Sequence, residues 1–520
     1  MVNDVRSYDI IAFGDEVPGV LAIITAAREH FRRNKKYPRI LLMSKGNMQE
    51  GIGGILVRGG LSYLDRSQVD QDLRDSLGLN SFGDPPAIYK EFLQKSGVVG
   101  IGLDPQKASL ALRQMLSENN VDLLSRIDIK SVTKTGKKLS IIITSNGSTY
   151  TGKIFIDSTI NAELAQAAGV QKLTGFASLG LPDAELPVTL IFETQGITPE
   201  KLKDIELNYL NNFTNTGNSA AQKSLLSAAG MDAKQAENLR KNLLDKQGKL
   251  KTLWIGPDYI DIRSSALSIA YQAFRGKKLS LLESGAILDS GNIAILGNSR
   301  LSWNALLFTV TATQAEELAK ADGKPTPAML QEFAFIEKWF KSIGATAVIP
   351  ASELYIRHAG NVTGVVNPLT GAEMLSGGVP VNEALGTFAY HFDVRGGISG
   401  IGPRAKDKGF SNLTFSHPIF NIGIRHALIK DIPNLAVVSP ASGFEGLAAA
   451  AGRIVEFNVG VGQGVGIAAI IALLNNRNLA DISNQEVKQV LVATSKLSRI
   501  FGMDKTAEAS RLNQLEGIMA

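Results

Sequence analysis

The stretch YDIIAFGDEVPGVLAIITAARE, residues 8–29, decides the fold. Its first six residues are an apolar run rich in isoleucine, which is typical of a strand buried in a parallel sheet. The turn GDEVPG occupies 14–19, and an apolar segment of helical composition follows it. A second apolar run, RILLM, lies at 39–43. Together these parts predict the strand–turn–helix–strand unit with which a doubly wound α/β domain begins.

The sequence pattern changes at about residue 176, and the earlier pattern returns near residue 411. The segment between them holds a strand-like LPVTLIFE, lysine-rich helical stretches and many glycines, which indicates a second domain. We therefore expect an α/β fold: a Rossmann-like domain with a parallel sheet, assembled from N- and C-terminal segments, plus an inserted α+β domain. The expected parts are 1–175 and 411–478 for the Rossmann-like domain, 176–410 for the inserted domain, and 479–520 for a C-terminal helical tail.

The charge balance and the apolar runs narrow the classes of partner. The 54 Lys and Arg against 49 Asp and Glu leave a net charge of +5, which is too weak over this length to indicate nucleic acid binding. The basic stretch at 28–39 has only two aromatic residues, which favours a solvated helix end over a phosphate or membrane-surface patch. The apolar run at 465–474 is too short to span a membrane, and the N-terminus lacks a signal-peptide core. We expect a soluble, cytoplasmic protein without an integral membrane segment.

The chain contains no cysteine. This excludes disulfides, thiolate metal sites, cysteine nucleophiles and a cysteine-linked cofactor. The spacing of the His, Asp and Glu residues predicts no metal site, and no serine lies in a nucleophile motif. Any chemistry must therefore come from the remaining polar groups or from a bound cofactor.

The turn after the first strand carries the first chemical motif. In a dinucleotide fold, the first glycine of this turn allows the tight bend, the second admits the pyrophosphate, and the third packs the helix on the strand. Gly14 and Gly19 fill the first and third positions, but Glu16 fills the second. A carboxylate about 4 Å from a phosphate charge costs roughly 4 kcal/mol in an intermediate dielectric. Glu16 therefore points away, pairs with Lys45 or Arg58, or faces no phosphate.

Polar side chains at the strand ends have both a structural and a ligand-binding interpretation. Asp15 and Glu16 can cap the helix that follows, so that the protein's own carboxylates fill the anion site. Ser44, at the end of the second strand, can bond a ribose hydroxyl or lie in a plain loop. Thr159 or Asn161, after the strand KIFID, can cap a helix while the turn borders a ligand.

Two glycine-rich segments also have two interpretations. Residues 51–62, GIGGILVRGGLS, hold five glycines, a density that marks close backbone approach or a series of tight turns. The glycines of GVGQGVG at 460–466 precede an Ala/Ile-rich segment. At a helix start they would aim several backbone N–H groups at an anion or a carbonyl-rich ring. The alternative is close packing of one helix on another through small residues.

In their order and spacing, these segments resemble the FAD-dependent oxidoreductase family with a glutathione-reductase-type FAD fold. The resemblance covers most of the chain, and its most specific part is NLAVVSP followed by GRIVEFNVGVGQGVGIAAI. The residues on matching positions there are Arg453, Gly462, Gln463, Gly466, Ala468 and Ala469. The other matching segments are 8–29, GIGGILVRGG at 51–60, LDPQKASLALRQMLSENNVDLL at 103–124, FIDSTINAELAQAAGV at 155–170, and LYIRHAGNVTG at 354–364.

The resemblance implies a bound FAD, held covalently or non-covalently, whose flavin ring lies between the FAD and substrate domains. Its N5 would exchange a hydride with a small or medium organic substrate. The electron acceptor and the oligomeric state stay open. The cofactor-binding residues expected on this basis are Gly14, Glu16, Pro18, Gly19, Ser44, Lys45, Gly53, Gly54, Arg58, Thr159, Gly462, Gln463, Gly464 and Gly466.

The sequence departs from the family pattern at its polar anchors, while the hydrophobic framework is kept. Glu16 replaces a glycine, and Ser44 replaces the acid that binds the ribose. Ile160 and Asn161 replace Gly-Asp, and Ser-Pro at 439–440 replaces Gly and a charged residue. The first hypothesis is an FAD-dependent oxidoreductase. The alternatives are a non-catalytic binding or assembly protein built on a degenerate FAD-binding fold, and a protein that binds a nicotinamide nucleotide.

A flavin dehydrogenase needs a proton acceptor or donor beside the hydride, and often cations for an acidic substrate. His358 lies in YIRH and His391 in YHFDVR, both in the expected substrate domain. Strand spacing would place Asp393 on the same face as His391, and Arg425 matches a family arginine near the flavin. For each, an ordinary structural hydrogen bond or ion pair is the alternative. The catalytic candidates are His358, His391, Arg357 and Arg425.

Overall fold

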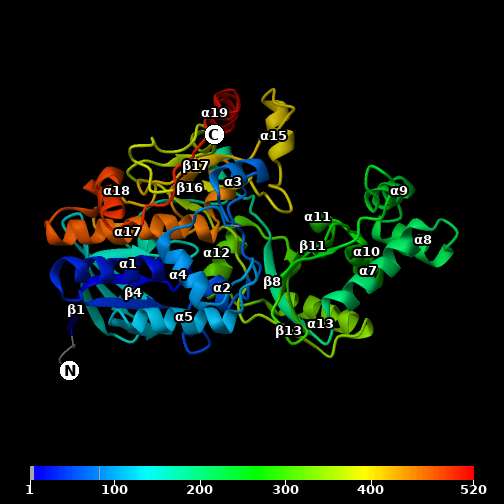
Figure 1. Ribbon diagram of the computed structural model, residues 1–520, viewed down its shortest axis with the longest axis horizontal. Coiled ribbons are helices and arrows are strands. Elements are labelled where there is room, and N and C mark those ends of the chain that lie inside the picture. The colour runs from blue at the N-terminus through cyan, green and yellow to red at the C-terminus, as the bar shows by residue number, and fades with distance from the viewer. Residues whose placement is uncertain (1–4, 81) are drawn as a thin grey trace.

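Two β-sheets organise the computed structural model, which describes residues 5–80 and 82–520 (Figure 1). The first sheet has the order β3-β2-β1-β6-β5-β4, and β18 also pairs with β6. β4 and β5 form an antiparallel meander, and the other strands of this sheet run parallel. The strands are β1 (Val5–Phe13), β2 (Ile40–Ser44), β3 (Val121–Ser125), β4 (Ile129–Thr135), β5 (Lys138–Thr144), β6 (Thr149–Asp157) and β18 (Leu435–Val437).

The parallel part of this sheet joins distant parts of the chain. Leu435 and Val437 of β18 lie beside Phe155 and Asp157 at the end of β6. All four residues are completely buried, as expected for apolar strands covered by helices on both faces. The predicted α/β fold with a parallel sheet is therefore confirmed, and the C-terminal third of the chain contributes a strand to it.

The closest helix pair in the first unit is α1 (Val17–Asn34) against α17 (Val455–Leu474), which lie side by side in Figure 1. A Cβ at Gly462 would lie 2.5 Å from the Pro18 carbonyl oxygen, and one at Gly466 would collide with the Ala22 carbonyl oxygen. The expectation that these glycines begin a helix is wrong. They lie inside α17, where their N–H groups belong to the helix and their missing side chains let two backbones approach.

Helix α17 is also the one helix among the described residues that is long and apolar enough to cross a membrane. The sequence run at 465–474 underestimated its length, because the glycines before it continue the helix. However, 89% of its apolar window is buried inside the protein. Its apolarity is therefore that of a core helix, surrounded on all sides by the protein.

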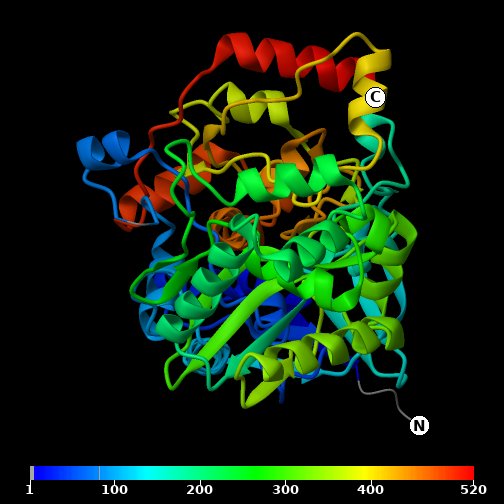
Figure 2. The same cartoon turned by 90° about the vertical axis from the view of Figure 1, so that its right-hand side faces the viewer.

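The second sheet has the order β13-β8-β12-β11-β10-β9 and is antiparallel throughout. It has its own hydrophobic core, which includes Phe192, Trp303 and Phe340. Figure 2 looks onto this unit, with its strands and helices in front. Its elements are β8 (Val188–Gln195), α7 (Pro199–Thr214), α8 (Ser219–Ala228), α9 (Ala233–Asn242), β9 (Trp254–Ile255), β10 (Tyr259–Asp261), α10 (Ala266–Arg275), α11 (Leu281–Ser284), β11 (Ala286–Ile295), β12 (Arg300–Phe308), α12 (Ala312–Lys320), α13 (Pro327–Ser342) and β13 (Ala347–Pro350).

The chain after β13 returns to the first unit. Met374, Phe388 and Ala405, from the part of the sequence expected to be inserted, lie in the core that holds α1 and α17. The remaining elements are α2 (Gly54–Val57), α3 (Gln71–Leu77), α4 (Ala87–Lys95), α5 (Pro105–Ser117), α6 (Glu163–Ala167), β7 (Lys172–Leu173), η1 (Ala177–Leu179), β14 (Asn361–Val362), β15 (Leu369–Thr370), α14 (Gly371–Leu375), β16 (Thr387–Ala389), α15 (Ile401–Asp407), β17 (Ile419–Asn421), β19 (Phe444–Glu445), α16 (Ala448–Gly452), η2 (Leu479–Asp481), α18 (Asn484–Ala493) and α19 (Thr506–Met519).

The packing of α1 on α17 predicts opposite effects for two helical glycines. Gly466→Ala should lower the free energy of unfolding by about 1–3 kcal/mol, because the added methyl group forces the two backbones apart. Gly517→Ala, in α19, meets no atom within 4 Å and should raise it by about 0.5–1 kcal/mol through helix propensity. Urea unfolding followed by circular dichroism measures both. Equal effects from the two substitutions would contradict the close packing.

Candidate functional site

The candidate site lies where β1, β2 and β6 end, at the edge where open α/β sheets bind ligands. Gly14 follows β1 with a φ of +95°, a backbone conformation that favours glycine. A Cβ there would lie 2.7 Å from the Thr159 nitrogen, and one at Gly19 would collide with the Ser158 side chain. Both glycines are therefore required so that the turn, α1 and the loop after β6 can pack together.

Asp15 lies at the centre of this edge and is 3% exposed. Its carboxylate accepts hydrogen bonds from the Ser44 hydroxyl at 2.7 Å and from the Gly53 N–H at 3.2 Å. Two nitrogens of the Arg58 guanidinium also bond it, at 2.5 and 2.9 Å. Burial alone would raise the pKa of Asp15, but the Arg58 charge and these hydrogen bonds hold it below its ordinary value. The hydrogen-bond donors around the buried Asp15 carboxylate therefore all come from the protein itself.

Arg58 joins this edge to the segment that follows the second sheet. Its Nε bonds Glu353 at 2.5 Å, and one terminal nitrogen bonds the Gly51 carbonyl oxygen at 2.7 Å. Burial raises the pKa of Glu353 to about 7, although the Arg58 charge opposes the shift. One buried cation thus holds two carboxylates.

Glu16 lies at the N-cap position of α1 but makes no capping hydrogen bond to that helix. Its two carboxylate oxygens instead accept the N–H of Ile55, at 3.2 and 3.1 Å. A Cβ at Gly54 would overlap this carboxylate, so the glycine is what admits it. Burial, with the nearby Asp15 charge, raises the pKa of Glu16 well above its ordinary value. The expected capping of α1 by these acids is wrong, since both carboxylates bond the 53–55 backbone.

The other polar groups expected at this edge are engaged by neighbouring side chains. Lys45 pairs with Glu163 at 2.8 Å, so it does not pair with Glu16. The Thr159 hydroxyl donates to Asp157 at 2.7 Å and accepts the first N–H of α6, at Glu163, as a capping residue. Burial raises the pKa of Asp157 to about 6. Asn161 donates to Glu316 at 3.2 Å.

The space left between these residues is small. The cavity bounded by Asp15, Glu16, Ser44, Arg58 and Thr159 has a volume of about 70 Å³, enough for roughly two waters. Pockets for drug-sized ligands measure about 300–1,000 Å³, and FAD is larger than most such ligands. In this arrangement the residues do not fit the FAD diphosphate that the resemblance implies.

The residues of α17 and its entry lie away from this edge. Gln463 accepts the Ile88 N–H at 3.1 Å, and a Cβ at Gly464 would meet Ile424. Arg453, just before α17, is buried and bonds the Tyr355 hydroxyl at 2.6 Å and Asp393 at 2.5 Å. In the structure, each of these residues therefore contacts another part of the protein.

The four catalytic candidates do not form one cluster. His358 is completely buried, with Nδ1 2.8 Å from Glu185 and Nε2 2.7 Å from Asn361. Burial would lower its pKa, but the Glu185 charge raises it above the ordinary value. Arg357 is buried too, and its pKa is lowered to about 10 by burial. It donates to the Pro187 carbonyl oxygen and the Thr189 hydroxyl.

The other two candidates are exposed. His391 bonds Gln68 at 2.7 Å and lies 3.9 Å from Asp393, but the two residues follow the end of β16 at Ala389 and share no strand face, so the expected strand is wrong. Arg425 is exposed and lines a separate cavity with Glu373 and Glu383. None of the four lines the cavity at the strand ends.

Sequence reasoning missed the role of Glu353, which lies far from Arg58 in the chain and in no recognisable motif. It named Arg58 as a partner for Glu16 and as a cofactor-binding residue, whereas Arg58 pairs with Asp15 and Glu353. The available signal was the pair of adjacent acids after a strand, which require a cation or backbone donors when they are buried. Among residues 5–80 and 82–520, no group of His, Asp or Glu is arranged to hold a metal ion.

Comparison with known proteins gives one family and several distant structures. The FAD dependent oxidoreductase family model matches residues 9–491. No curated protein matches by sequence. Halogenase PltM is 12% identical with a TM-score of 0.38, covering 94% of this chain and 75% of its own. L-proline dehydrogenase from P. horikoshii is 11% identical with a TM-score of 0.36, covering 95% and 99%. Flavin-dependent brominase Bmp2 is 10% identical with a TM-score of 0.34, covering 94% and 84%.

The family match extends from the second residue of the opening YDIIAF segment into α18. The matched residues include the N-terminal strands of the parallel sheet and β18, the turn at 14–19 and helix α17. FAD is the cofactor of this family, and its reactions are oxidations and reductions. The chain belongs to the FAD dependent oxidoreductase family.

Proposed function

We propose that this protein keeps the fold of the family but closes the diphosphate position with its own carboxylates, and that it acts as a binding protein. One observation carries this proposal. Asp15 and Glu16 bond the backbone N–H groups of Gly53 and Ile55, in the glycine-rich segment that the resemblance assigns to the cofactor. The protein's own oxygens thus occupy backbone N–H groups in a segment that the resemblance places along the bound cofactor.

Replacing these carboxylates by a diphosphate is costly. A phosphate beside Asp15, whose pKa is held below its ordinary value, would meet a charge of the same sign, at roughly 4 kcal/mol for a pair about 4 Å apart. Moving Asp15 aside would separate it from buried Arg58, and breaking a buried ion pair costs about 3–5 kcal/mol. FAD binding would have to supply both amounts before it gained any affinity.

The second candidate function is that of an FAD-dependent oxidoreductase which transfers a hydride between a small or medium organic substrate and the flavin N5. The family match over residues 9–491 favours it. It requires the Asp15 and Glu16 side chains to leave the 53–55 backbone when FAD enters. Since FAD does not fit the residues as they are arranged, we assign no reaction step to them.

Glu16→Gly distinguishes the two functions. If the site is closed, the wild-type protein should purify colourless, and FAD added to it should wash out. Glu16→Gly removes one carboxylate and restores the family glycine, so it should increase FAD affinity at least about tenfold, or 1.4 kcal/mol. Flavin absorbance after desalting and a fluorescence titration with FAD measure the effect.

Glu16→Gln is the matched control, because it keeps the bulk of the side chain and removes its ability to ionise. We expect it to gain less affinity for FAD than Glu16→Gly. A wild-type protein that purifies yellow, with one FAD extracted per chain, would overturn the closed site and establish the second candidate.

The pKa of Glu353 predicts that stability depends on pH. Because burial raises this pKa to about 7 in the folded protein, against roughly 4.3 in an unfolded chain, the folded state holds the proton longer. The free energy of unfolding should therefore fall as the pH rises from about 4.5 to 7. Glu353→Gln should reduce this decrease in the free energy of unfolding by roughly 1–3 kcal/mol.

Urea unfolding of the wild type and Glu353→Gln at several pH values between these limits tests the prediction. Glu337→Gln, at an exposed position of α13, is the matched control for loss of a glutamate. An unchanged slope in Glu353→Gln would show that this carboxyl group is not the one that titrates.

A further inference from the structure

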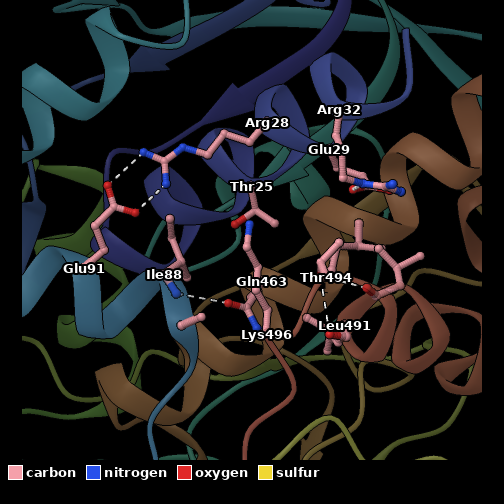
Figure 3. A pocket seen from close by; sticks show the side chains of 13 residues that line it. Thr25, Arg28, Glu29, Arg32, Ile88, Glu91, Gln463, Leu491, Thr494 and Lys496 are labelled. Atoms are coloured by element: carbon pink, nitrogen blue, oxygen red, sulfur yellow. Dashed lines mark hydrogen bonds and ion pairs between the residues drawn. The ribbon is translucent and has the colours of Figure 1, made fainter. Parts of the chain in front are cut away.

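A separate cavity of about 200 Å³ lies against the C-terminal half of α1, between α1, α4, α17 and α18 (Figure 3). Its apolar lining includes Ile88, Ile467 and Leu491, which are buried. The cavity is smaller than the 300–1,000 Å³ typical of drug-sized ligands, and it suits a molecule of roughly seven to ten heavy atoms. No residue of the diphosphate position and no catalytic candidate lines it, and of the expected cofactor-binding residues only Gln463 is among the residues that line it.

The carboxylates at this cavity already have cations. Glu91 receives two hydrogen bonds from the Arg28 guanidinium, as Figure 3 shows. Glu29 is 6% exposed and receives hydrogen bonds from both Arg32 and Arg33. The acceptors are thus satisfied, and among the side chains that line the cavity the cations Arg28, Arg32 and Lys496 outnumber the carboxylates Glu29 and Glu91.

Two donors at the cavity have no partner among the described residues. Gln463 is 3% exposed, and its Oε1 accepts the Ile88 N–H, which leaves its Nε2 group free at the cavity. Lys496 is exposed, and its ammonium group makes no hydrogen bond or ion pair in the part of the chain that the structure describes, although its charge helps to lower the pKa of Glu91. Because the Gln463 Nε2 group is reached from the cavity, an acceptor there can bond it.

The local backbone fixes Lys496 at the rim. α18 ends at Ala493, and Ser495 then adopts a φ of +54°, in the left-handed region. This turn lets the Lys496 N–H bond the Leu491 carbonyl oxygen at 2.8 Å. A non-glycine residue in this conformation is strained by about 1–2 kcal/mol, so the lysine is placed by a defined turn.

We propose that this cavity binds a small organic carboxylate with a short apolar chain. The Lys496 ammonium would pair with the carboxylate, the Gln463 amide would donate to it, and the apolar chain would lie against Ile88, Ile467 and Leu491. Free donors, a positive surplus and an apolar wall together select an anion with an apolar part over a cation or a neutral molecule. Because the cavity lies apart from the strand ends, the proposal stands under either function above.

Isothermal titration calorimetry with hexanoate tests the proposal on the full-length protein. We expect saturable binding in the millimolar range or tighter, weaker at high salt because the charge pair at the rim is screened. Hexanol, which has the chain without the charge, and inorganic phosphate, which has charge without the chain, should each bind much more weakly. Phosphate binding as tight as hexanoate would identify a plain anion site and overturn the carboxylate assignment.

Two variants locate the binding. Lys496→Gln should weaken hexanoate binding about fivefold, as expected for a partly exposed ion pair, and Gln463→Met should weaken it by removing the amide donor. Lys234→Gln, at an exposed lysine of α9, is the matched control and should leave binding unchanged. Thermal unfolding checks that each variant is folded.

Three outcomes would overturn the proposal. They are no hexanoate binding up to about 10 mM, equal binding of hexanol, and full hexanoate affinity in folded Lys496→Gln. The FAD titration of the wild type is a separate measurement. A yellow wild type would end the closed-site function and leave the carboxylate site untouched.

Discussion

The buried ion pair between Asp15 and Arg58 holds the candidate site together. Asp15 leaves the end of β1, and Arg58 follows α2, so the pair fixes the glycine-rich segment against the sheet. Through Glu353 the same guanidinium reaches the chain that follows the second sheet. Because the pair is almost fully buried, removing either partner would leave an uncompensated charge. The geometry of the diphosphate position therefore depends on this contact.

That dependence explains how the family framework and the altered anchors coexist. A glycine in place of Glu16 would leave the Ile55 N–H free to bond a cofactor atom, whereas Glu16 supplies an oxygen from the chain itself. Ser44 likewise donates to Asp15, where the family has an acid for a ribose hydroxyl. Each replacement satisfies a backbone or side-chain group that a cofactor would otherwise satisfy. Both replacements thus contribute to one closed site.

The sequence predicted the framework well because local patterns determine it. The apolar runs at β1, β2 and β6 and the glycines at 14 and 19 gave the strand–turn–helix unit and its tight packing. The glycines at 460–466 misled, since glycine at a helix start and glycine at a helix crossing have the same spacing, and only the position of α1 separates them. The role of Glu353 could not be read at all, because a long-range ion pair leaves no periodic signal. Asp15 and Glu16 were recognised as a problem for a phosphate, but their true partners at 53 and 55 required the fold.

When a site satisfies its own hydrogen-bond donors, a ligand that enters it adds less to the stability of the fold. A protein whose binding loops keep unpaired N–H groups gains stability when the ligand arrives, in proportion to RT ln(1 + [L]/Kd). Here Asp15 and Glu16 already bond Gly53 and Ile55, so the first unit reaches its packed state without a dinucleotide. Binding a dinucleotide would therefore cost free energy at first, because it must break contacts that the folded chain has made. At the cavity beside Gln463 the condition differs, since a ligand there would add contacts to Gln463 and Lys496 without breaking the Arg28–Glu91 and Arg32–Glu29 ion pairs.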